Sequence, residues 1–114
     1  MARSKAYVAS VGLTPIGDHW EKSLLDLAVD AARGALKPLG KKAPDQVIVG
    51  NMFSSVGAGQ EHLGAYLASA LGLAGVPAYK VEAACSSGGS AFNVGYNLVR
   101  SGAIASALVV GLRR

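Results

Sequence analysis

The only cysteine of this 114-residue chain, Cys85, lies in the segment VEAACSSGGSAF, residues 81–92. The apolar residues before it are typical of a strand, and residues 86–100 after it have the spacing of a helix. A thiol at a helix N-terminus is a candidate nucleophile, because the unpaired N–H groups of the first turn favour the thiolate. The alternative is a small side chain that fills the core, which is the usual role of a lone cysteine.

The neighbours of Cys85 weaken the case for a core filler. Ala84 and residues 86–90 are all alanine, serine or glycine, so a substrate can approach closely and the helix can pack tightly against a neighbour. A residue between a strand and a following helix also lies at the carboxyl edge of a parallel sheet, where α/β proteins bind ligands. From these residues alone, the nucleophile and the core filler remain evenly balanced.

Strand-like and helix-like segments alternate along the chain. Four short segments have the apolar or alternating pattern of strands: 6–12, 46–50, 78–83 and 105–111. Three segments between them carry apolar residues at helical spacing: 23–36, 63–71 and 86–100. Ser23 followed by Asp26 predicts a capping box, Pro38 predicts the end of that helix, and residues 51–60 form a glycine-rich loop. The order β-α-β-α-β-α-β predicts an α/β fold, with a mostly parallel sheet and helices on both faces.

Composition and charge indicate one globular domain and exclude several classes of partner. The chain is 51% apolar and 16% charged, and its length allows a single domain. The net charge of +4 comes from scattered basic residues without a nucleic-acid reading motif. No apolar run approaches the ~18 residues of a membrane helix, the first residues lack a convincing signal peptide, and one cysteine cannot form an internal disulfide. We therefore expect a cytoplasmic protein without nucleic-acid or membrane partners.

The two histidines are the imidazoles available to serve Cys85 as a base. Nothing in the spacing of His19 and His62 brings either one to the thiol, so surface or structural roles are favoured for both. Two histidines and one cysteine this far apart also make a poor metal site. We therefore predict no bound metal.

Two glycine-containing segments come close to known phosphate-binding patterns without matching them. Gly57, Gly59 and Gly64 follow a predicted strand, but the third glycine falls two residues late for a dinucleotide fingerprint. The segment GALKPLGKK, residues 34–42, has five residues between its glycines and lacks the Ser or Thr of a phosphate loop. Neither pattern predicts a nucleotide site.

The segment around Cys85 resembles the nucleophile segment of the thiolases, enzymes that form or cleave the carbon–carbon bond of 3-ketoacyl-CoA. The segments VGLTPIGDHWEKSLLDLAVDAARGAL and VGNMFSSVGAGQEHLGAYLASALGL also resemble this family, above all its archaeal and sterol-carrier-type branches. The resemblance covers essentially the whole chain and implies that residues 1–114 are a fragment of a thiolase N-terminal domain. Ketosynthase-type condensing enzymes share the fold and a similar ACSS stretch, and they are the alternative, although SSGGSAF is more similar to thiolases.

The resemblance implies acyl transfer between coenzyme A thioesters, without a permanently bound cofactor. Cys85 would carry the acyl group, and its backbone N–H would donate to the oxyanion. The family's histidine in Gly-His-Pro, its second cysteine in Cys-x-Gly and its Asn-Glu-x-Phe element are absent from these 114 residues. We therefore expect the chain alone to be inactive or nearly so. A non-catalytic fragment or subunit, completed by a second chain, is the third hypothesis.

The resemblance also implies partners. It predicts a homo-oligomer, and it places residues 54–64, SSVGAGQEHLG, at a dimer contact beside the nucleophile. A plain loop is an equally good interpretation of that segment. In archaeal relatives, the family works beside an HMG-CoA synthase and a small OB-fold protein, which makes these two proteins candidate partners by analogy.

Overall fold

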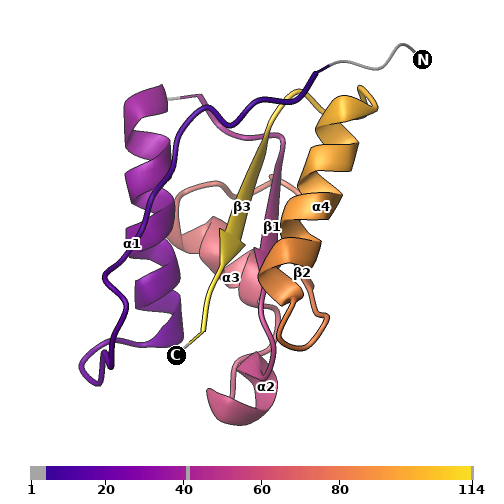
Figure 1. Ribbon diagram of the computed structural model, residues 1–114. Helices are drawn as coiled ribbons and strands as arrows, with labels where there is room; N and C mark the ends of the chain where they lie inside the picture. The colour runs from indigo at the N-terminus through magenta and orange to yellow at the C-terminus, as the bar shows by residue number, and fades with distance from the viewer. Residues whose placement is uncertain (1–4, 41, 114) are drawn as a thin grey trace.

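The structure is a computed structural model that describes residues 5–40 and 42–113. Within these residues, three strands form one parallel sheet with the order β2-β1-β3 (Figure 1). The strands are β1 (Gln46–Gly50), β2 (Ala78–Val81) and β3 (Ala107–Gly111). The helical elements are α1 (Leu24–Leu36), the 3-10 turn η1 (Lys37–Leu39), α2 (Ser54–Gly57), α3 (Leu63–Ala70) and α4 (Ser87–Arg100). The predicted α/β class with a parallel sheet is confirmed.

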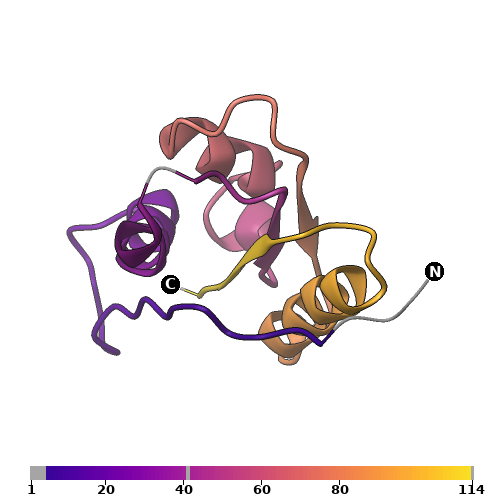
Figure 2. The same ribbon diagram turned by 90° about the horizontal axis from the view of Figure 1, so that it is seen from above.

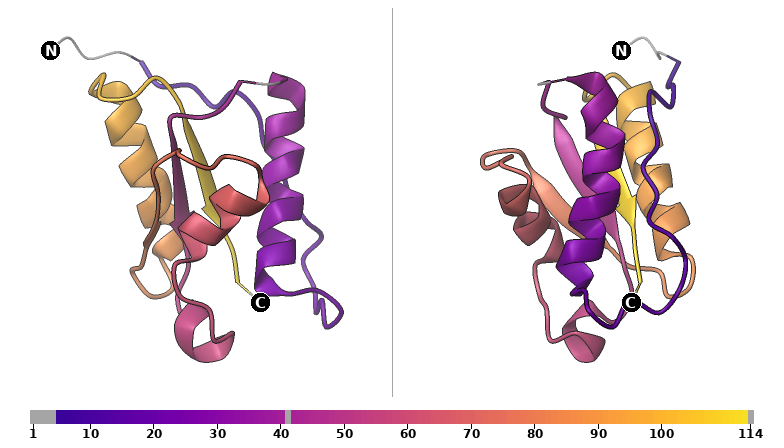
Figure 3. Two further views of the ribbon diagram at one scale, coloured as in Figure 1. Left: turned by 180° about the vertical axis from the view of Figure 1, so that it is seen from behind. Right: turned by 90° about the vertical axis from the view of Figure 1, so that its left-hand side faces the viewer.

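Helices cover both faces of the sheet (Figures 2 and 3). On one face, α1 and α3 pack against Val47 and Val49 of β1 and against the inward residues of β3. On the other face, α4 packs closely because Gly95 lies directly over the side chains of Val109 and Ile48. Val47, Ile48 and Val49 are fully buried, which is the pattern of a central strand in a parallel sheet.

The ends of α1 follow the local signals in the sequence. The N–H of Asp26 donates to Ser23 Oγ (3.0 Å), and the N–H of Ser23 donates to Asp26 Oδ2 (3.1 Å), which completes the predicted capping box. The hydrogen bonds from the Ser23 backbone and side chain hold the pKa of Asp26 below its ordinary value. The α-helix ends at Leu36, and Pro38 lies in the following η1 turn, because proline cannot supply the next N–H of the ladder.

Residues 6–12 were predicted as the first strand, and this prediction is wrong. The segment is extended but unpaired, and it leads from the α4 side of the molecule to α1 (Figure 2). The Ser10 hydroxyl donates to the carbonyl of Ala35, and a Cβ on Gly12 would meet the backbone of Ala31 and Ala35. The segment therefore packs on α1 and pairs with neither outer edge of the β2-β1-β3 sheet. Three of its large apolar side chains stay exposed: Tyr7, Val8 and Val11.

The other differences are at element boundaries. The predicted loop 51–60 contains the short helix α2, β2 ends at Val81, and β3 begins at Ala107. Among residues 5–40 and 42–113, no helix combines the length and the apolar composition needed to cross a membrane.

Candidate active site

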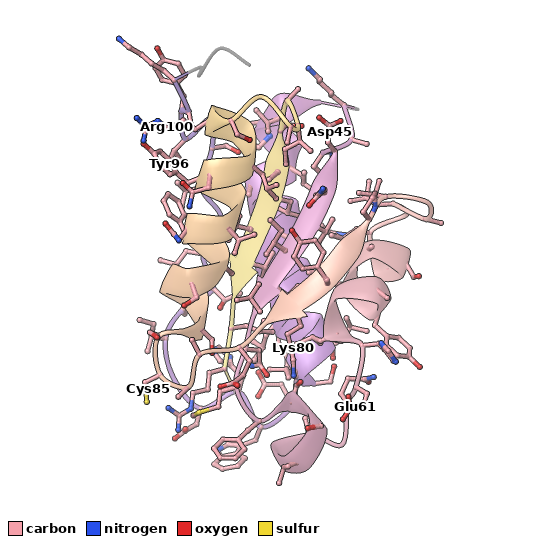
Figure 4. All side chains as sticks on the ribbon, turned by 90° about the vertical axis from the view of Figure 1, so that its right-hand side faces the viewer. Asp45, Glu61, Lys80, Cys85, Tyr96 and Arg100 are labelled. Atoms are coloured by element: carbon pink, nitrogen blue, oxygen red, sulfur yellow. The ribbon has the colours of Figure 1, made fainter. Side chains whose placement is uncertain are left out.

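Cys85 lies on the connection between β2 and α4, at the carboxyl end of the sheet (Figure 4). Its side chain is exposed, so the interpretation as a core filler is wrong. Lys80 and Glu61 lie at the same end of the molecule, whereas Asp45 and Arg100 lie at the opposite end (Figure 4). The thiol is therefore accessible and lies at the edge of the sheet where the sequence placed it.

The backbone immediately before Cys85 has an unusual conformation. Ala84 has φ = +51°, in the left-handed region that an alanine rarely adopts. The N–H of Ala84 donates to the Glu82 carboxylate, and its carbonyl accepts from the Ser87 hydroxyl (2.7 Å). Such a conformation costs about 1–3 kcal/mol and persists only where the surroundings hold it, as at many functional sites.

Two serines form hydrogen bonds that join this turn to the start of α4. Ser87 is 4% exposed, and its Oγ accepts the N–H of Ala83 (2.9 Å) while its hydroxyl donates to Ala84. Ser86 donates to the carbonyl of Ala83 through both its N–H (3.1 Å) and its hydroxyl (2.8 Å). Cys85 is therefore held directly before the N-cap of α4, next to a helix turn whose first N–H groups lack intrahelical partners.

The first turn of α4 rests directly on the backbone of the sheet. A Cβ on Gly50 would meet the Ser87 carbonyl and lie 2.8 Å from the Gly88 Cα, and a Cβ on Gly111 would lie 3.3 Å from the same Cα. The predicted close approach of this helix is confirmed at Gly88, whereas the space beside Gly89 is open. Sequence reasoning missed Gly50, although a glycine that ends a buried strand is a signal of close backbone approach.

An open depression of about 580 Å³ lies at the carboxyl end of β1. Its walls include polar, charged and aromatic residues: Asp18, His19, Trp20, Asn51, Phe53 and Arg113. Asn51 is 3% exposed; its Nδ2 donates to the carbonyl of Leu112 (2.7 Å), and its Oδ1 has no hydrogen-bond partner among the described residues. Cys85 does not line this depression, so the thiol and the depression are separate features.

The structure does not bring either histidine to Cys85. His19 Nε2 lies 2.6 Å from the carbonyl oxygen of Pro15, and His62 is an exposed residue that precedes α3 with φ = +52°. In the described part of the chain, no hydrogen bond joins an imidazole to the thiol, and no group of three His, Cys, Asp or Glu residues could hold a metal ion. The candidate site therefore consists of an exposed thiol and the backbone that supports it.

The glycines that come close to a dinucleotide fingerprint have separate structural roles. Gly57 ends α2, Gly59 has φ = +64°, and Gly64 is buried where a Cβ would lie 2.7 Å from the Tyr79 nitrogen. They do not form one turn from a strand into a helix, which a dinucleotide site needs. The segment 34–42 includes Lys41, which lies outside the described residues.

Comparison with known proteins identifies the family. A family model described as "Thiolase, N-terminal domain" matches residues 6–114. The chain belongs to the thiolase family. It is 37% identical over 109 residues to the acetyl-CoA acetyltransferase of Methanocaldococcus jannaschii, and this match covers 94% of the chain and 28% of that protein. The acetyl-CoA acetyltransferase of Methanothermobacter thermautotrophicus is also 37% identical, over 97 residues.

Two synthases also match this thiolase-family chain, one in sequence and one in fold. The mycobacterial beta-ketoacyl-[acyl-carrier-protein] synthase III of Mycobacterium avium is 33% identical over 91 residues, which is 80% of this chain and 27% of that protein. The structure of 3-oxoacyl-[acyl-carrier-protein] synthase III from Aquifex aeolicus matches with a TM-score of 0.69 at 22% identity, over 91% of this chain and 34% of that one. The predicted thiolase-like fold is confirmed, and the chain spans 28% of the length of the first archaeal relative.

Proposed function

We propose that Cys85 is the acyl-accepting nucleophile of a thiolase-type acyl transfer between coenzyme A thioesters. The observation that carries the proposal is an exposed thiol on a strained turn, directly before the N-terminus of α4 and at the carboxyl end of a parallel sheet. Coenzyme A enters as part of the substrate, and no cofactor is bound permanently.

The chemistry proceeds through a covalent intermediate. The Cys85 thiolate attacks the carbonyl carbon of an acyl-CoA, and the resulting oxyanion accepts a hydrogen bond from the Cys85 N–H. The C–S bond to coenzyme A then breaks, the leaving thiolate takes up a proton, and the acyl group remains on Cys85. In the second half-reaction, an acetyl-CoA deprotonated at its methyl carbon attacks this S-acyl group and releases the thiolate.

Both half-reactions need a base for proton transfer. Neither His19 nor His62 contacts Cys85, so no imidazole is positioned to take the proton of the thiol or of acetyl-CoA. We therefore propose that this chain alone accepts an acyl group slowly and does not complete the condensation.

The proposal is tested by incubating the purified chain with acetyl-CoA and locating the acetyl group by peptide mass spectrometry. We expect one acetyl group, on Cys85, in the wild type and in the control Ser101→Ala, whose substitution lies at the far end of α4. Cys85→Ala should remain unlabelled. Acetylation confined to lysines, or equal labelling of Cys85→Ala, would contradict the proposal.

A ketosynthase-type condensing enzyme is the second candidate. Two of the matched proteins are synthases that act in acyl-carrier-protein chemistry, by their names, which favours this candidate over a non-catalytic subunit. The thiolase and the ketosynthase differ in the acyl donor. Faster labelling of Cys85 from acetyl-CoA than from an acetylated carrier protein supports the thiolase, and the reverse order supports the ketosynthase. A non-catalytic subunit, the third candidate, would show no labelling from either donor.

We also propose a homo-oligomer in the cytoplasm, with HMG-CoA synthase and an OB-fold protein as further partners by family analogy. Two surfaces support self-association: β2 is an edge strand, and residues 54–64 carry the exposed Val56. Multi-angle light scattering tests the oligomer. A Val56→Glu variant is expected to shift it toward the monomer, and a wild-type monomer at all concentrations would refute it.

A further inference from the structure

We propose that Asn51 is a positioning residue for Cys85, because it ties the carboxyl ends of all three strands together beneath the first turn of α4. This inference builds on the proposed acyl-accepting role of Cys85, but the experiments below do not require an acyl donor.

The hydrogen bonds of Asn51 reach both neighbours of β1. Its backbone N–H donates to the carbonyl of Val81, the last residue of β2 (3.2 Å). Its side-chain Nδ2 donates to the carbonyl of Leu112, directly after β3 (2.7 Å), and the N–H of Leu112 donates back to Gly50 (3.2 Å). The backbone N–H at this position therefore links β1 to the end of β2, as any residue except proline would, and the asparagine side chain adds the link to the end of β3.

These strand ends support the thiol without an intervening side chain. Gly50 precedes Asn51, and the backbone of Ser87 and Gly88 packs directly onto it. Val81 lies four residues before Cys85 and opens the turn that carries it. A shift of the strand ends is therefore transmitted to both sides of Cys85.

Stability alone does not explain an asparagine at this position. Asn51 is 3% exposed, and its Oδ1 is buried without a hydrogen-bond partner among the described residues. An unpaired buried acceptor opposes the gain from the Nδ2 hydrogen bond. A role in holding the support of Cys85 in place accounts for a polar side chain here.

Asp45 provides a matched control at the other end of the same two strands. Its Oδ2 accepts the N–H groups of Ala105 (2.7 Å) and Ser106 (3.2 Å), so it joins the start of β1 to the start of β3. Asp45 lies at the end of the molecule opposite Cys85 (Figure 4). Loss of either side chain removes hydrogen bonds between the ends of β1 and β3, but only Asn51 is next to Gly50, on which the first turn of α4 packs.

The experiment compares Asn51→Ala with Asp45→Ala by urea unfolding, amide hydrogen exchange and alkylation of Cys85 by iodoacetamide. After correction for global stability, Asn51→Ala should accelerate exchange of the amides of Ser86 and Ser90 about tenfold, and it should change the alkylation rate. Asp45→Ala should leave both unchanged. The inference is overturned if the two variants affect these amides and the thiol equally.

A wild-type measurement keeps the inference testable if Asn51→Ala does not fold. Native-state exchange at increasing urea should show Leu112 and Ser86 opening in one step that is separate from the opening of Ala105. If Ser86 instead opens together with Ala105 and apart from Leu112, the inference fails. An absence of acetyl transfer with these exchange results intact would refute the proposed function and leave the positioning role standing.

Discussion

Replacing Gly50 with alanine is expected to displace the first turn of α4 and destabilise the fold. The new Cβ would meet the Ser87 carbonyl and lie 2.8 Å from the Gly88 Cα, and neither is the end of a flexible side chain. The backbone on both sides must therefore move. Overpacking of this kind costs about 1–3 kcal/mol, and contact with the backbone of a buried strand and a helix places Gly50→Ala near the upper end.

Gly89→Ala is the matched control, because it makes the same chemical change two residues after Ser87. Apart from its chain neighbours and the backbone of its own helix, no described atom lies within 4 Å of a Cβ at Gly89, and the residue is within α4. Alanine is the better helix former, so this variant should be more stable by about 0.5–1 kcal/mol. The free energy of unfolding in urea is measured for both variants. Equal stability of Gly50→Ala and wild type would refute the argument that the helix rests on the strand backbone.

Three further changes test the core, a second close approach and the capping box. Ile48→Ala should lower the free energy of unfolding in urea by about 2–5 kcal/mol, because the side chain is fully buried between the sheet and α4; a loss as small as that of an exposed residue would contradict this packing. Gly64→Ala should lower the free energy of unfolding by about 1–3 kcal/mol, since its Cβ would lie 2.7 Å from the Tyr79 nitrogen. An unchanged melting temperature in calorimetry would contradict this close approach, because it would mean that α3 moves away freely. The pKa of Asp26 is lower in the folded state, so its contribution to stability is present above its unfolded-state pKa and is lost as the pH falls through the folded-state pKa. Asp26→Asn should therefore be less stable than wild type at neutral pH and equally stable in acid. A difference in stability that persists in acid would show that it does not come from the ionised Asp26 carboxylate.

The helices were predictable because their signals are local. The ends of α1 depend on Ser23, Asp26 and Pro38, which act within a few residues of the chain. The short helix α2 was missed because it lies in a glycine-rich segment and follows Phe53, which has φ = +69°. No pattern of residue types predicts a phenylalanine in the left-handed backbone conformation.

Residues 6–12, which were predicted as a strand, show that a local sequence pattern does not determine strand pairing. Residues 6–12 have the alternation of a strand, but a strand also needs a free edge beside it. In the structure, residues 6–12 pair with neither outer edge of the β2-β1-β3 sheet, and Ser10 and Gly12 instead contact the backbone of α1. This outcome depends on contacts with distant residues of the chain, which alternation does not encode.

The candidate site was predictable in part. The position of Cys85 between β2 and α4 followed from the order of the elements, but the sequence did not decide whether its side chain is buried, and the structure shows that it is exposed. Gly50 and Asn51 were not recognised because their roles depend on strand ends that are far apart in the sequence. A polar residue directly after a buried strand was the one available signal for Asn51.

The most direct test of the account compares acetylation of Cys85 by acetyl-CoA in the folded chain and in the chain unfolded in urea. The amount of hydroxylamine-sensitive acetyl group on Cys85 is followed over time by mass spectrometry. If the turn at Ala84 and the start of α4 activate the thiol, the folded chain should react at least about tenfold faster than the unfolded chain. Equal rates, or a slower reaction in the folded chain, would contradict the assignment of Cys85 as the nucleophile.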